Sequence, residues 1–133
     1  EALEEEVPGG TETLLVVEDE ETLLRLLKGF LEEKGYRVLT ARDGSELIDV
    51  YKQHRNEIAL VFTDMGLPIQ GGWEGFLKIK ELNRKAKVIL ASGYLDANAK
   101  SELLKQGAKD FIQKPYEPNE ILLKIRQVLD HPD

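Results

Sequence analysis

The segment IALVFT, residues 58–63, is apolar almost throughout and is followed directly by Asp64. A run that is apolar on both faces of an extended chain is typical of a central strand in a parallel sheet. Residues 65–72, MGLPIQGG, are rich in turn-forming residues and predict a loop after this strand. The sequence therefore predicts a buried strand that has a carboxylate at its carboxyl end.

Other strand-like segments lie on both sides of this central strand and alternate with helical patterns. The remaining predicted strands are residues 13–17 (TLLVV), 36–40, 87–91 and 109–113. The first helix is expected to carry Leu23, Leu26, Leu27, Phe30 and Leu31 and to stop at Gly35, and the second to start near Asp43 or Ser45 and carry Leu47, Ile48 and Tyr51. The third helix is expected to carry Trp73, Phe76, Leu77, Ile79 and Leu82. The fourth carries Leu103 and Leu104 before Gly107, and the fifth, which starts beside Pro118, carries Ile121, Leu122, Ile125, Val128 and Leu129. Five strand–helix repeats predict an α/β fold with a parallel sheet, right-handed crossovers and helices on both faces.

The composition excludes several classes of chemistry. The 133-residue chain has the usual size of one domain and carries 25 Asp and Glu against 18 Lys and Arg, a net charge of −7. This acidic balance argues against direct nucleic-acid binding, which needs a basic surface. The chain has no Cys and only two His, so disulfides, thiolate sites and multi-histidine metal sites are excluded. Any chemistry must come from carboxylates, hydroxyls and lysines.

We expect one folded domain over residues 13–130, with a linker over residues 1–12 and a tail over residues 131–133. The first twelve residues are charged and then contain a Pro-Gly-Gly sequence. Because the first residue is not Met, we expect the chain to be a fragment of a longer protein. No apolar run approaches the roughly 18 residues of a membrane span and no signal peptide opens the chain. We therefore expect no membrane contact and a cytoplasmic location.

Polar residues follow the predicted strands at their carboxyl ends, the edge at which doubly wound sheets bind ligands. These residues are Glu18, Asp19, Thr40, Asp64, Ser92 and Lys114. Three carboxylates gathered there would repel one another, and Lys114 supplies only one positive charge. A hard cation such as Mg²⁺, which prefers oxygen ligands, would supply the rest. A carboxylate nucleophile at Asp64, with a metal, an ammonium and a hydroxyl around it, is what phosphoryl transfer needs.

Four motifs in this chain resemble the receiver domain of two-component response regulators. They are LLVVEDEE (14–21), FTDMGLP (62–68), LASGY (90–94) and QKPY (113–116), in the same order and spacing as in that family. The resemblance extends from residue 13 to about residue 130. It implies a flavodoxin-like, doubly wound five-stranded sheet of order 2-1-3-4-5, a phosphoaspartate at Asp64 and Mg²⁺ as cofactor.

The resemblance also implies roles for the residues around Asp64. Asp19 and Asp64 would bind the metal directly together with the backbone oxygen of Gly66, and Glu18 would help through water. Lys114 is similar to the lysine that pairs with the phosphoryl group. Two positions depart from the common pattern: Glu18 stands where the family often has Asp, and Gly66 places no side chain beside the phosphoryl group.

A conformational switch is implied as well, with Ser92 as its hydroxyl and Phe111 as its aromatic residue. Ser92 stands where Thr is common and lacks the methyl group that stiffens χ1. Ser before Gly is also ordinary loop chemistry, and Phe111 could equally be a core residue. In receivers the lysine–proline bond is cis, so we predict a cis Lys114–Pro115 bond.

The function implied is a phosphoaccepting signalling domain in a phosphorelay, not an enzyme. Its partner would be a histidine kinase or a histidine phosphotransfer domain, and the face formed by the fourth and fifth helices is a candidate for homodimerisation. We expect the chain to be the C-terminal receiver of a hybrid sensor histidine kinase, with a stand-alone response regulator as the alternative.

Two other functions compete with this one. A degenerate receiver would act only as a protein-interaction module. A haloacid-dehalogenase-like phosphatase also uses an Asp nucleophile and Mg²⁺, but it needs a second Asp two residues further on, where this chain has Gly66. Because Gly66 has no group to orient an attacking water and Tyr94 is bulky enough to cover its approach, we expect a phosphoryl group on Asp64 to be long-lived.

Overall fold

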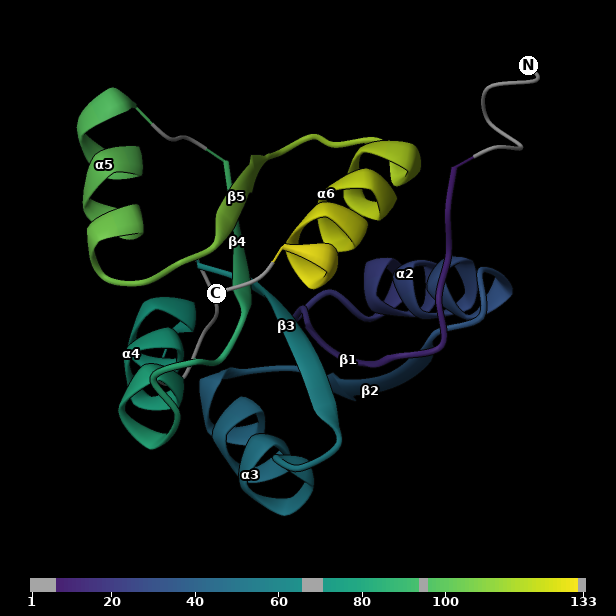
Figure 1. The fold of residues 1–133 in the computed structure, drawn as a ribbon, viewed down its shortest axis with the longest axis horizontal. Coiled ribbons are helices and arrows are strands. Elements are labelled where there is room, and N and C mark those ends of the chain that lie inside the picture. The colour runs from purple at the N-terminus through teal and green to yellow at the C-terminus, as the bar shows by residue number, and fades with distance from the viewer. Residues whose placement is uncertain (1–6, 66–70, 94–95, 132–133) are drawn as a thin grey trace.

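A computed structural model of the chain describes residues 7–65, 71–93 and 96–131. Strands and helices alternate through these residues (Figure 1). In chain order the elements are β1 (Thr13–Val17), α2 (Glu21–Glu33), β2 (Arg37–Ala41), α3 (Gly44–His54), β3 (Ile58–Asp64), α4 (Gly72–Leu82), β4 (Val88–Ser92), α5 (Ala97–Lys105), β5 (Asp110–Gln113) and α6 (Pro118–Asp130).

The five strands form one parallel sheet in the order β2-β1-β3-β4-β5. β1 lies between β2 and β3, so that Leu14 has Val38 and Leu60 as its partners in register. β3 is buried from Leu60 to Asp64, as its apolar sequence predicts. The flavodoxin-like order 2-1-3-4-5 is confirmed, and it brings the carboxyl ends of all five strands to one edge.

Successive residues of each strand point to opposite faces of the sheet, and this alternation divides the core in two. One half lies beneath α2 and α6 and includes Leu14 and Phe62. The other lies beneath α3, α4 and α5 and includes Leu15 and Leu90. Figure 1 shows α2 and α6 on one side of the sheet and the other three helices on the opposite side. Both faces of the sheet are therefore covered.

Local sequence signals set several helix ends. Asp43 caps α3 by accepting a hydrogen bond from Glu46 N at 2.8 Å, and Asp96 caps α5 by accepting one from Ala99 N at 2.7 Å. Gly35, which follows α2, has φ of +102°, a left-handed conformation that glycine adopts without a steric penalty. The start of the third helix near Asp43 and the stop at Gly35 were both predicted.

Three leucines that we expected on buried helix faces are exposed. Leu26 of α2 is 65% exposed, Leu77 of α4 is 38% exposed and Leu104 of α5 is 50% exposed. The residue of α2 that faces the sheet in place of Leu26 is Leu24, which is 7% exposed. Leu24, Leu27 and Leu31 recur at intervals of three and four residues, so they occupy one stripe of the helix. A leucine-rich helix has more than one such stripe. The stripe that we expected, which includes Leu23 and Leu26, lies to one side of the stripe that packs on the sheet.

The segment before β1 contacts the folded body. Gly10 N donates to Lys34 O at 3.1 Å, and Arg126 Nη1 donates to Gly9 O at 2.9 Å. A side chain at Gly9 would meet the Lys34 carbonyl oxygen, so glycine permits this close approach. Residues 7–12, which we expected to belong to a linker, are thus held against α2 and α6.

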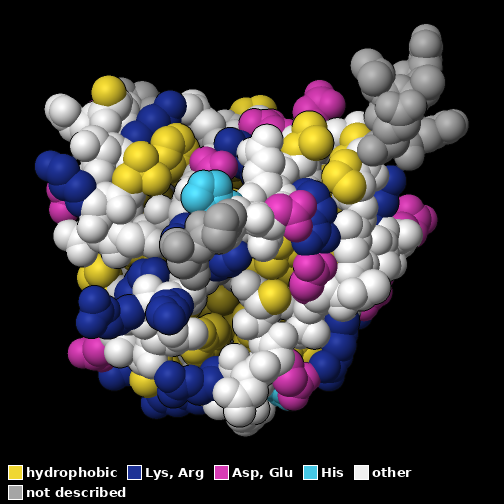
Figure 2. Space-filling view, viewed as in Figure 1, with side chains coloured by type: hydrophobic (Ala, Val, Ile, Leu, Met, Phe, Trp, Pro, Cys, Tyr) yellow, Lys and Arg dark blue, Asp and Glu magenta, His cyan; other side chains and the backbone are white. Residues whose placement is uncertain are grey.

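Basic side chains gather around α4 in the view of Figure 2. This helix and the loop after it contribute Lys78, Lys80, Arg84 and Lys85. Arg84 and Lys85 precede β4, so they lie at the amino ends of the strands and not at the carboxyl edge where the acidic residues collect. Within the described part of the chain, no helix is both long enough and apolar enough to cross a membrane.

Candidate functional site

The predicted acidic residues meet at the carboxyl edge of the sheet. Glu18 and Asp19 directly follow β1, and Asp64 is the last residue of β3. Carboxylate oxygens of these three residues all lie within 4.8 Å of one another. β1 and β3 are neighbours in the sheet, which is why residues far apart in the sequence come together here.

Lys114 reaches this cluster from the end of β5. Its Nζ donates to Asp64 Oδ2 at 2.8 Å and lies 3.7 Å from Glu18 Oε1. The backbone N of Lys114 donates to Ser92 O at 2.8 Å, which fixes the start of its loop against the end of β4. The Lys114–Pro115 peptide bond is cis, as predicted.

The backbone places Glu18 inside the protein. Its N–H donates to Ala41 O at 3.1 Å, and its Oε2 accepts a hydrogen bond from Glu20 N at 3.1 Å. Glu18 is 4% exposed, whereas Asp19 is exposed. The longer side chain that stands in place of the common Asp therefore turns inward to the cluster.

The site holds more negative charge than positive charge. Burial raises the pKa of Glu18, and the charge of Asp64 adds to this effect, while the Glu20 N–H and the Lys114 ammonium oppose it. Burial alone would lower the pKa of Lys114, but its hydrogen bond and charge interaction with Asp64 outweigh burial, and the pKa is raised. One firmly protonated ammonium thus faces three carboxylates.

This donor set fits a hard divalent cation. Carboxylate oxygens are preferred ligands of Mg²⁺, and the three that converge here lie close enough together to share one ion. The predicted fourth donor, the backbone oxygen of Gly66, lies outside the described residues. Glu18, Asp19 and Asp64 are therefore the residues that we assign to a candidate metal site.

Ser92 and Phe111 lie on the same face of the sheet. Leu90 belongs to the core half beneath α3, α4 and α5, and Ser92, two residues further along β4, points to the same side. Phe111 is the register partner of Leu90 on β5 and packs against the same core half. Both are partly exposed. The two predicted switch residues are thus neighbours across adjacent strands, with Ser92 nearer the acidic edge.

Tyr116 is a residue beside the site to which the sequence analysis gave no role. Its ring packs edge-on against Phe62 with centroids 5.9 Å apart. Burial, with the nearby charge of Glu18, raises the pKa of Tyr116 to about 12, so its hydroxyl stays protonated. The motif QKPY contains this tyrosine, but nothing in a single sequence shows where its ring packs.

Tyr116 also lines an apolar groove between α2 and α6. The groove has a volume of about 290 Å³ and is lined by Leu23, Leu26, Leu27, Phe30, Tyr116, Pro118 and Ile121. It includes the exposed Leu26 and begins two residues beyond Lys114. An apolar surface therefore adjoins the acidic site; the sequence analysis missed it because Leu26 was expected to be buried.

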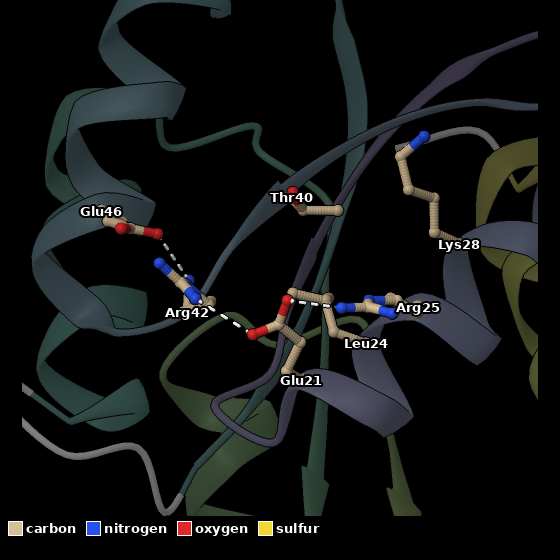
Figure 3. Close-up of a pocket in the computed structure, with 7 residues that line it drawn as sticks. All are labelled: Glu21, Leu24, Arg25, Lys28, Thr40, Arg42 and Glu46. Carbon is tan, nitrogen blue, oxygen red and sulfur yellow. Dashed lines mark hydrogen bonds and ion pairs between the residues drawn. The ribbon is translucent and has the colours of Figure 1, made fainter.

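A second pocket, of about 450 Å³, lies between the start of α2 and the end of β2 (Figure 3). Glu21 is its centre: it pairs with Arg25 Nη2 at 3.1 Å and with Arg42 Nη1 at 3.4 Å. Figure 3 shows these charged side chains directed toward one another, with Thr40 beside them. These ion pairs are exposed, and exposed ion pairs contribute little to stability.

Comparisons with known proteins agree with the fold. A family model of the response regulator receiver domain matches residues 14–126. An uncharacterized transcriptional regulatory protein of Bacillus subtilis (strain 168), YbdJ, is 35% identical over 118 residues, which are 89% of this chain and 51% of that protein. The chain thus spans about half the length of that curated relative.

Solved receiver structures superpose closely on this chain. A response regulator receiver domain protein from Clostridium thermocellum has a TM-score of 0.83 at 29% identity, covering 90% of this chain and 94% of that one. The CheX–CheY–BeF3–Mg²⁺ complex from Borrelia burgdorferi gives a TM-score of 0.85 at 28% identity, covering 90% of each chain. With the family match over most of its length, this chain belongs to the response regulator receiver domain family.

Proposed function

We propose that this chain accepts a phosphoryl group onto Asp64 from a phosphohistidine of a histidine kinase or a histidine phosphotransfer domain. The observation that carries the proposal is the setting of Asp64, whose Oδ2 lies 2.8 Å from Lys114 Nζ beside two further carboxylates. An Asp64 oxygen attacks the phosphorus and forms the new P–O bond. The P–N bond to the imidazole breaks, and its electron pair stays on the ring nitrogen.

The surrounding residues offset the charge that the phosphoryl group brings. Lys114 is protonated and already in contact with Asp64, so its ammonium can follow the phosphoryl oxygens without a large movement. Glu18, Asp19 and Asp64 would hold Mg²⁺, which supplies further positive charge for those oxygens when bound. The similarity to a receiver solved with BeF3 and Mg²⁺ supports this assignment.

Phosphorylation is proposed to change the face formed by α5, β5 and α6. Ser92 turns toward the phosphoryl oxygens, and Phe111 moves into the space that the hydroxyl leaves. Ser92 and Phe111 lie on the same face of two adjacent strands, and this position supports the coupling. The change is a shift between two populated states, and the altered face is where an output partner or a second copy would bind. If Ser92→Ala is phosphorylated and signals like the wild type, the coupling is wrong.

The test of phosphoacceptor function is intact-mass analysis after incubation with acetyl phosphate and Mg²⁺. We expect one phosphoryl adduct on the wild type and none on Asp64→Asn. Asp49→Asn, which changes an exposed acid on α3, is the matched control and should keep the adduct. A wild type without an adduct would favour an interaction-only module. Steady phosphate release over many turnovers would favour a phosphatase.

The apolar groove between α2 and α6 is the surface that we propose the phosphodonor protein covers. It adjoins Lys114 through Tyr116, and its Leu26 is 65% exposed and lies outside the buried core. Leu26→Lys should slow transfer from a phosphohistidine protein and leave acetyl phosphate reactivity unchanged. Leu104→Lys, at an exposed leucine of α5, is the control that should affect neither rate. Equal effects of both substitutions would reject the groove.

The parent protein that we propose is a hybrid sensor histidine kinase acting in the cytoplasm, with this receiver at its C-terminal end. Its proposed role there is relay of the phosphoryl group within a two-component system. A native gene that encodes only these residues from a start codon would contradict the hybrid arrangement and favour a stand-alone response regulator.

A further inference from the structure

We propose that Lys100 of α5 is a positioning residue that holds the Phe111 ring at the edge of the sheet and so favours the resting arrangement of the switch. The regulatory part of this inference rests on the proposed function, because Phe111 acts as a switch only if Asp64 is phosphorylated. The contact itself is independent of that function.

The ammonium of Lys100 lies over the face of the Phe111 ring. Its Nζ is 5.4 Å from the ring centroid, within the range of about 6 Å at which a cation is attracted to an aromatic face. Both side chains are partly exposed. Phe111 is therefore not locked by a closed core, and a single neighbour can shift its position.

The ring is the electrostatic partner of Lys100 within the described residues. No ion pair joins this lysine to any carboxylate in that part of the chain, whereas Lys114 pairs with Asp64 and Lys124 pairs with Asp110. The backbone of Lys100 is fixed, because its N–H donates to Asp96 O at 3.0 Å in the capped first turn of α5. The ammonium is thus presented to the ring from a defined position.

Movement of the ring toward Ser92 would give up this contact. Phe111 pairs with Leu90, and Ser92 lies two residues further toward the acidic edge on the same face. The contact with Lys100 therefore stabilises only one of the two ring positions, and a difference of that kind shifts a two-state equilibrium. Loss of this partly exposed cation–π contact should raise the population in which the ring is turned toward Ser92 roughly two- to fivefold.

The contact can be followed directly by ¹⁹F NMR of the whole chain labelled with 4-fluorophenylalanine. The chain has four Phe, and the Phe111 signal is assigned by its loss in Phe111→Leu. Lys100→Met removes the charge but keeps the length of the side chain, and Lys100→Arg keeps a cation. Lys105→Met, on the same helix, is the matched control.

In unliganded protein we expect Lys100→Met to move the Phe111 signal toward its position in wild type saturated with beryllofluoride and Mg²⁺. Lys100→Arg and Lys105→Met should keep the wild-type signal. Lys100→Met should also tighten the apparent dissociation constant for beryllofluoride roughly two- to fivefold, and this gain should disappear in a Phe111→Leu background.

A Phe111 signal that Lys100→Met leaves unmoved overturns the inference. An affinity gain that persists in the Phe111→Leu background does so too, because Lys100 would then act by another route. Wild type that binds no beryllofluoride with Mg²⁺ would instead overturn the proposed function. In that case the signal of the unliganded variants still decides whether Lys100 holds the ring.

Discussion

Two clusters of charge in this molecule are each built around one cation, and they differ in how the charge is relieved. Arg126 of α6 contacts both carboxylate oxygens of Glu12, at 2.7 and 3.2 Å, and both of Asp130, at 2.8 and 3.1 Å. Lys114 contacts Asp64 and lies near Glu18 at the carboxyl edge. Both cations thus face more than one carboxylate.

The direction of the pKa shifts separates the two clusters. The hydrogen bond from Arg126 holds the pKa of Glu12 below its ordinary value, and the pKa of Arg126 is raised. Burial raises the pKa of Glu18 instead. Water also reaches the Asp130 side chain, which is 65% exposed, but barely reaches that of Glu18, which is 5% exposed. In the first cluster Arg126 therefore favours the ionised form of Glu12 and stabilises the fold, whereas the second buries a carboxylate whose charge a further cation can relieve.

Substitution of Lys114 should lower the phosphorylation rate, whereas substitution of Arg126 should lower stability. The largest effect is expected at Lys114. Lys114→Met should lower the rate of phosphorylation by acetyl phosphate about 10²–10³-fold, because the ammonium stabilises the charge of the transferring group. The adduct is measured by intact mass against time. Lys124→Met, which breaks the ion pair with Asp110 at the start of β5, should keep the wild-type rate. Equal losses in both variants would assign Lys114 a structural role only.

Arg126→Met should lower the free energy of unfolding by about 1–3 kcal/mol, the usual scale for lost hydrogen bonds to charged groups. The loss combines the contacts to Glu12, Asp130 and Gly9 O. Urea unfolding measures it, with Arg25→Met, at a 77% exposed side chain, as a control that should change little. The phosphorylation rate of Arg126→Met should match the wild type. If Arg126→Met were phosphorylated slowly but unfolded with the wild-type free energy, the roles assigned to the two clusters would be reversed.

The smallest expected effect is a pH dependence at Glu12. Because its folded-state pKa is below the ordinary value of 4.5, its contribution to stability is present above that value and is lost as the pH falls through the folded-state pKa. Glu12→Gln should cost about 0.5–1 kcal/mol at pH 7, and this cost should shrink below pH 4.5. Urea midpoints across this range measure it. A cost that stays constant with pH would show that the carboxylate charge is not what stabilises the segment.

The sheet could be predicted from the sequence because its strands are short apolar runs bounded by charges and turns. The predicted 13–17 matches β1, and the other strands are displaced by no more than about one residue. The packing stripe of α2 could not be predicted, since Leu23, Leu24, Leu26 and Leu27 allow several faces and only the position of the sheet selects among them.

The same contrast holds for the two charge clusters. Glu18, Asp64 and Lys114 were predicted together because a parallel sheet brings the carboxyl ends of its strands to one edge. The pair Glu12–Arg126 spans 114 residues and involves no strand end, so no periodicity or spacing in the sequence points to it. Packing of the first and last segments creates this cluster, and such packing is known only once the fold is known.

The most direct test of the account is the effect of Mg²⁺ on the free energy of unfolding of wild type, Asp64→Asn and Arg126→Met. The account predicts that Mg²⁺ stabilises the wild type, by about 2.7 kcal/mol at a hundredfold excess over its dissociation constant. The same increment should be found in Arg126→Met, from its lower starting stability, and most of it should be lost in Asp64→Asn. An increment that is absent from the wild type, or equal in Asp64→Asn and wild type, would contradict the claim that the carboxyl-edge cluster holds uncompensated charge for a cation.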